Sequence, residues 1–115
     1  MKVSELTGDL LDMWVAKAQG RNVRKLGDAY WDDDASCAIG GKFGESASTD
    51  WAVGGPIIER EKIGVTVGVL AETWFALRLA DGVLSAKPVV RGATPLVAAM
   101  RAFVTSKFGE EVPEE

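Results

Sequence analysis

The residues best suited to chemistry in this sequence lie in one segment, residues 48–61, which begins Ser48-Thr49-Asp50-Trp51 and ends Glu59-Arg60-Glu61. If the last triplet is extended, Glu59 and Glu61 share one face and Arg60 points the other way. A planar guanidinium suits a carboxylate or phosphate, and a buried carboxyl with a raised pKa can transfer protons. The segment predicts either a ligand or acid–base site, or a structural turn in which Asp50 accepts from backbone amides, Trp51 packs on the core and Arg60 pairs locally.

Histidine is absent and cysteine occurs once, which excludes most familiar catalytic chemistry. Without an imidazole there is no Ser-His-Asp or Cys-His arrangement and no histidine-bound zinc. Cys37 alone cannot form a cysteine metal cluster or an internal disulfide, and we expect it to act as an inert small hydrophobic residue. A single cysteine is typical of a reducing compartment. We expect no catalytic residue, no metal site and no cofactor.

Two polar clusters have ordinary explanations. The glycine-rich Gly40-Gly41-Lys42-Phe43-Gly44 lacks the glycine spacing of a phosphate loop, has Phe43 where Ser or Thr would hold magnesium, and precedes no expected helix. Four aspartates at 28, 32, 33 and 34 do not have the spacing of a calcium loop. We expect a surface loop and a solvated turn.

A basic cluster of Lys17, Arg21, Arg24 and Lys25 lies at the end of the first expected helix and just beyond it. It could contact nucleic-acid phosphates, but it contains no interleaved aromatic residues, and cations are favoured near a helix C-terminus in any case. Nucleic-acid binding therefore stays a third alternative.

The 115-residue chain has a net charge of −4, and residues 28–61 alone hold eight acidic and two basic side chains. This length suits one domain. Glu5 and Asp9 interrupt the region where a signal peptide would need its apolar stretch, and Glu72 and Arg78 interrupt the richest apolar run. We expect a cytoplasmic protein that does not enter a membrane.

Two helices are expected near the ends of the chain. The first runs from Thr7, a capping residue, to Gly20, with apolar side chains at helical spacing. In the second, Thr94 is the cap, Pro95 the first helical residue and Gly109 the end.

Between the helices we expect an irregular excursion over about residues 20–50 with at most one short hairpin, and a turn at Gly54-Gly55-Pro56. Residues 63–69 alternate like a half-buried strand, and Asp81-Gly82 predicts a hairpin between residues 74–80 and 83–90. The expected fold is α+β, a small antiparallel sheet packed by an N-terminal and a C-terminal helix. One domain covers residues 1–109, and residues 110–115 form an acidic flexible tail.

Three ordered blocks resemble the phage NinX-like family. They are Ser4-Glu5-Leu6-Thr7-Gly8 with the helix that follows, Ser48-Thr49-Asp50-Trp51 with Gly54-Gly55-Pro56-Ile57-Ile58-Glu59-Arg60-Glu61, and Thr94-Pro95-Leu96-Val97-Ala98-Ala99-Met100-Arg101 with Ser106-Lys107-Phe108-Gly109. The resemblance implies a small phage or prophage protein with an accessory role, located in the host cytoplasm during infection. Its activity is not established, so no catalytic residue carries over.

The blocks also suggest where a site could form. Asp50, Trp51, Glu59 and Arg60 come from one block and Thr94 and Arg101 from another, so these six could converge near the start of the last helix, whose free amides suit an anion. The leading hypothesis is a non-enzymatic module that binds a host or phage protein and forms a small homo-oligomer, because four tryptophans exceed what such a core needs. The alternative is a small-ligand or enzymatic site at these six residues.

Overall fold

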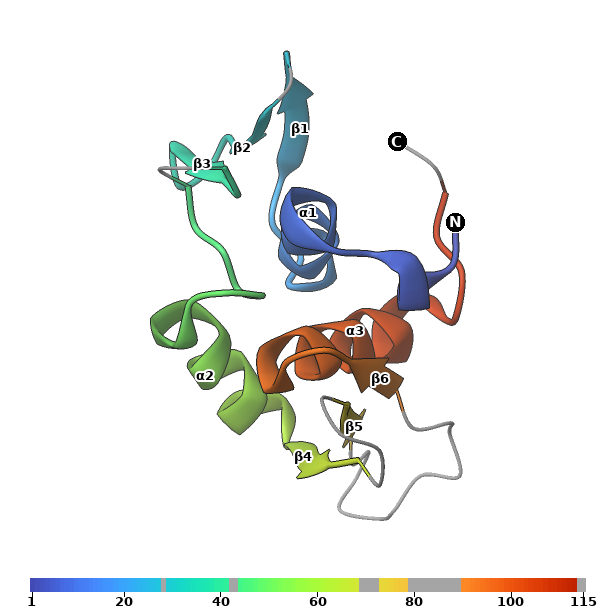
Figure 1. Ribbon diagram of the computed structural model, residues 1–115. Helices are drawn as coiled ribbons and strands as arrows, with labels where there is room; N and C mark the ends of the chain where they lie inside the picture. Colours follow the sequence, from blue (N-terminus) through green and yellow to red (C-terminus); the bar gives the residue numbers. More distant parts are fainter. Residues whose placement is uncertain (28, 42–43, 69–72, 79–89, 114–115) are drawn as a thin grey trace.

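A computed structural model describes residues 1–27, 29–41, 44–68, 73–78 and 90–113 (Figure 1). In chain order the elements are η1 (Val3–Glu5), α1 (Gly8–Ala18), β1 (Val23–Leu26), β2 (Ala29–Asp32), β3 (Cys37–Ile39), α2 (Trp51–Glu61), β4 (Ile63–Val67), β5 (Trp74–Arg78), β6 (Val90–Gly92) and α3 (Pro95–Phe108). The predicted α+β class is confirmed, with a helix near each end. The described strands form two antiparallel sheets, β1-β2-β3 and β4-β5-β6, where one sheet was expected.

The two predicted helices, α1 and α3, form the centre of the molecule. Figure 1 shows the first sheet beyond α1 and the second sheet beyond α3, so the helices lie between the sheets. In α3, Thr94 Oγ1 accepts from Val97 N at 3.1 Å, Pro95 occupies the first turn, and Gly109 follows the last residue with φ +89°. The capping pattern predicted from the sequence is therefore present in α3.

Helix α2 contradicts the sequence prediction, which put a turn at Gly54-Gly55-Pro56. All three residues lie inside α2, which begins after Asp50, ends at Glu61 and is followed by Lys62 with φ +55°. The side chain of Asp50 accepts from Ala52 N at 2.9 Å and caps the helix. Capping and burial of Ile57 outweigh the low helix propensity of glycine and proline, because tertiary packing routinely overrides local preference.

The three strands of the first sheet lie in the region expected to be irregular. Strand β2 pairs with both neighbours, with Trp31 opposite Arg24 on one side and Ala38 on the other. The sheet is joined to α1 by buried Tyr30 and Ile39, which belong to the main hydrophobic core. This region is more regular than the sequence indicated.

The second sheet contains the predicted valine-rich strand. Strand β4 pairs with β5 from Ile63 opposite Arg78 to Val67 opposite Trp74, and β6 pairs with the other edge of β5. At Gly92, β6 approaches α3 so closely that an added Cβ would lie 2.8 Å from Ala98 Cα. The predicted Asp81-Gly82 turn lies outside the described residues.

The chain end expected to be flexible is attached to the N-terminus as far as it is described. Val3 N donates to Glu110 O at 2.9 Å, Val112 N donates to Met1 O at 2.9 Å, and the Met1 ammonium donates to Val112 O at 2.8 Å. Val112 is also buried. Residues 110–112 thus lie against the N-terminal segment, and Val112 reaches the core.

Candidate functional site

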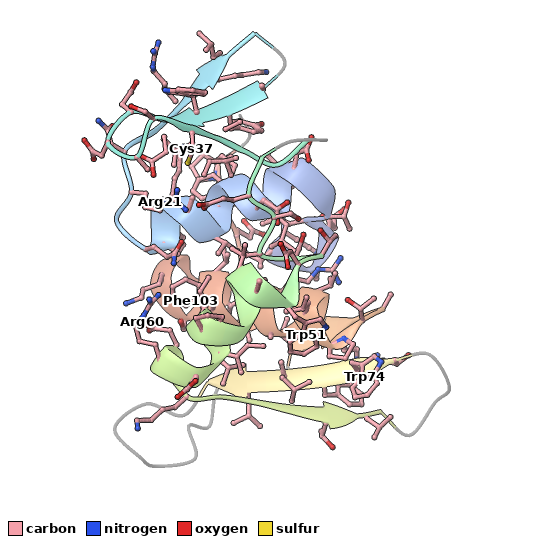
Figure 2. The ribbon with its side chains drawn as sticks, turned by 90° about the vertical axis from the view of Figure 1, so that its left-hand side faces the viewer. Arg21, Cys37, Trp51, Arg60, Trp74 and Phe103 are labelled. Carbon is pink, nitrogen blue, oxygen red and sulfur yellow. The ribbon has the colours of Figure 1, made fainter. Side chains whose placement is uncertain are left out.

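Helix α2 carries four of the six predicted site residues and separates them into two groups. Asp50 and Trp51 lie at its beginning, whereas Glu59 and Arg60 lie in its last turn. With a rise of 1.5 Å per residue, the two groups are about 13 Å apart along the helix. Figure 2 shows Trp51 and Arg60 at opposite ends of α2. The segment thus forms two separate surfaces.

At the beginning of α2, Asp50 and Thr94 act as helix caps. Each side chain accepts from a backbone amide of its own helix, Asp50 from Ala52 and Thr94 from Val97. The first half of α2 packs against the start of α3, because an added Cβ at Gly54 would lie 2.6 Å from a methyl carbon of Leu96. Both capping side chains are exposed, but their hydrogen bonds stabilise the helices.

Trp51 is the most exposed aromatic residue among those described, with 57% of its surface accessible. Its ring edge lies near Gly55, whose added Cβ would be 3.9 Å from Trp51 Cε3. The expectation that Trp51 packs into the core is not met, and a large apolar ring faces solvent instead.

At the end of α2, Arg60 donates from Nε to Glu61 at 3.2 Å. Arg60 also lines an open pocket of about 330 Å³ between the C-terminal ends of the three helices, with Gln19, Arg21, Phe103 and Lys107. None of the other five predicted residues lines this pocket. The arrangement places cations beside helix C-termini, as helix dipoles favour.

Arg101 has a structural role in α3. Its guanidinium donates to Leu6 O and to Arg91 O, each at 3.0 Å, so it ties η1 and β6 to α3. Burial lowers the pKa of Arg101 from its ordinary value. The six predicted residues therefore do not form one site. Asp50 and Thr94 cap helices, and Arg101 connects η1 and β6 to α3. Arg60 and exposed Glu59 lie at one end of α2, and Trp51 lies at the other.

The basic cluster considered for nucleic-acid binding is partly neutralised. Arg21 donates from Nε to Asp32 at 2.5 Å and from Nη1 to Glu45 at 2.7 Å. Arg24 donates to Asp33 at 2.8 Å. Burial opposes the charge of Arg21, but hydrogen bonds with Glu45 and Asp32 outweigh it and raise the pKa of the guanidinium. Two of the four cations that would bind phosphates are thus already paired with carboxylates.

Asp32 and Cys37 both contact Arg21. Asp32 accepts from Asp34 N at 2.9 Å and Ala35 N at 3.1 Å as well as from Arg21, so it closes a turn. Cys37 Sγ lies 3.5 Å from Arg21 Nη2. Across the described ranges, no group of three or more cysteine or acidic residues has the geometry to hold a metal ion.

Asp12 is a buried carboxylate that was not among the residues predicted to be important. Its carboxylate lies between α1 and the loop before α2, where it accepts from Ser46 Oγ at 2.7 Å and from Ser48 N at 2.9 Å. Asp12 is 3% exposed. Its position on the buried face of the first helix was the available signal, because a carboxylate there needs donors.

Among the described residues, no helix combines the length and the apolar character needed to span a membrane.

Comparison with known proteins gives one family. The family model described as "Bacteriophage P22, NinX" matches residues 2–107. No curated protein matches the chain. Among the described elements, the match runs from η1 into the last turn of α3.

Proposed function

Because the chain belongs to the bacteriophage P22 NinX family, we propose that it is a phage or prophage accessory protein that binds another protein and catalyses no reaction. The host cytoplasm is the compartment that best suits a phage protein with a single cysteine. Its partner is a host or phage protein.

The observation that carries this proposal is the exposed ring of Trp51. Tryptophan is enriched among residues that dominate protein–protein binding energy, because one side chain buries a large apolar area with little loss of conformational entropy. The chain does not use this ring for its own core, whereas Trp14 is 5% exposed and packs against Phe108 with 5.4 Å between ring centroids.

The alternative of a small-ligand or enzymatic site has less support. It needs Asp50 and Trp51 close to Glu59 and Arg60, and α2 holds the two groups apart. Nucleic-acid binding also has less support, because Arg21 and Arg24 already pair with carboxylates.

The experiment is affinity purification of the tagged chain from cells carrying the phage, with Trp51→Ala as the test variant. Leu26→Ala is the matched control, because Leu26 is 51% exposed and lies on β1, away from α2. We expect a specific co-purifying protein to be lost from Trp51→Ala and kept by Leu26→Ala, with equal melting temperatures. Retention of the same protein by Trp51→Ala would contradict the proposal.

A further inference from the structure

The outer strands of the two sheets differ in how they are protected from pairing with other chains. Strand β1 carries Arg24 and Lys25, and the short strand β6 carries Arg91. The loop after β3 covers its outer edge, where Glu45 N donates to Ala38 O at 3.1 Å. Charges, short strands and covering loops are common means of preventing edge-to-edge association.

Strand β4 has none of these protections among the described residues. Its sequence, Ile63-Gly64-Val65-Thr66-Val67, contains no charge and no proline, and it is the longest of the four outer strands. It pairs only with β5, so one edge has no strand beside it in the described part of the chain. Val67 is 67% exposed, the largest value among the exposed large hydrophobic residues described.

The register shows which backbone groups point outward from this edge. Gly68 N donates to Thr73 O at 2.7 Å, which places that pair in the hydrogen-bonded phase of the antiparallel ladder. The phase repeats every second residue, so Gly64 and Thr66 direct their N–H and C=O groups toward β5. Val65 and Val67 therefore direct theirs toward the open edge.

We propose that β4 pairs antiparallel with β4 of a second copy of this chain, joining the two β4-β5-β6 sheets into one six-stranded sheet. With the two-fold axis at Val65, Ile63 of one copy faces Val67 of the other, and the outward-pointing backbone groups of both strands become hydrogen-bonded. Such a contact is isologous, so the same five residues supply both sides.

A second copy fits this edge because the strand complements itself. Pairing opposes β-branched side chains, which favour cross-strand packing, and it opposes no like charges. A shallow apolar groove of about 420 Å³, lined by Val65, Thr66, Phe75 and Leu77 among others, lies beside the same edge. Pairing brings the grooves of the two copies together. The inference is independent of the proposed role of Trp51, which lies on α2.

Amide hydrogen exchange of the full chain at low and high protein concentration tests the pairing directly. We expect the amides of Val65 and Val67 to exchange quickly in dilute protein and to become at least tenfold slower as the dimer forms. The amides of Gly64 and Thr66, which face β5, should be protected at both concentrations. Fast exchange of Val65 and Val67 at every concentration would overturn the proposal.

Two variants separate this edge from the rest of the molecule. Val67→Lys and Thr66→Lys each add a charge at an exposed position of β4, and Leu26→Lys adds the same charge to exposed β1. By light scattering, we expect the wild type and Leu26→Lys to show twice the mass of one chain, and the β4 variants to have a dimer dissociation constant at least tenfold higher. A monomeric wild type, or dimers unaffected by both β4 substitutions, would overturn the proposal.

Discussion

Asp12 and Asp32 are two nearly buried carboxylates that hold the N-terminal half of the chain together. Asp12 connects α1 to the loop that leads into α2, and Asp32 connects the first sheet to Arg21 at the end of α1. A buried carboxylate is stable only where donors surround it, so each side chain fixes the segments that provide its donors. These contacts organise the region that sequence periodicity left irregular.

Replacing Asp12 by Ala should destabilise the protein by about 2 kcal/mol, because Ser48 N and Ser46 Oγ lose their acceptor. Urea denaturation measures this change. The matched control is Asp9→Ala on the exposed side of the same helix, where one hydrogen bond to Gly41 N is lost and a smaller effect is expected. Equal losses for the two variants would show that Asp12 is not a structural connector.

The stability contributed by Asp32 should depend on pH. Hydrogen bonds from Ala35 N and then from Arg21 lower the pKa of Asp32 from its ordinary value. A carboxyl whose pKa is lower in the folded state stabilises the fold while ionised, and this stability is lost as the pH falls below about 4. The difference in melting temperature between wild type and Asp32→Asn should therefore be large at neutral pH and shrink in acid. A constant difference across that range would refute this account.

At the scale of elements, the end helices could be predicted and α2 could not. Thr94, Pro95 and Gly109 are local signals that act within one helix, so the sequence alone locates α3. Gly54-Gly55-Pro56 are also local signals, but they disfavour the helix that forms. The contrary signals were Asp50 as a cap and the spacing of Val53 and Ile57, which puts both on one face of a helix. Packing of that face on α3 determines the result.

The adjacent glycines of α2 should respond oppositely to alanine. At Gly54 an added Cβ would collide with Ala47 O and Leu96, so Gly54→Ala should destabilise the fold by about 1–3 kcal/mol. At Gly55 the nearest atom is Trp51 Cε3 at 3.9 Å, so Gly55→Ala should stabilise α2 by about 0.5–1 kcal/mol through helix propensity.

Thermal or urea unfolding of the two glycine variants measures both changes in the free energy of unfolding, which should have opposite signs. Stabilisation by Gly54→Ala would mean that α2 does not approach α3 as closely as the structure shows. Destabilisation by Gly55→Ala would contradict a relaxed helix at that position.

At the scale of the whole molecule, the candidate site differs from its prediction because it depends on α2. An extended segment would have left Asp50, Trp51, Glu59 and Arg60 free to gather near the start of α3. A helix carries Trp51 and Arg60 to opposite ends instead. Arg101 lies in one of the segments that resemble the NinX-like family, and it was a candidate for that reason. Its contacts with Leu6 and Arg91 depend on long-range packing, which no local sequence pattern predicts.

Within the described residues, Trp51 lies outside the core, and we propose that the partner binds through this residue. Site-specific photo-cross-linking tests it most directly: a photoreactive amino acid replaces Trp51 in cells carrying the phage, and Leu26 in a parallel control. We expect one discrete cross-linked protein from position 51 and none from position 26. Cross-linking at neither position, or the same products from both, would contradict it.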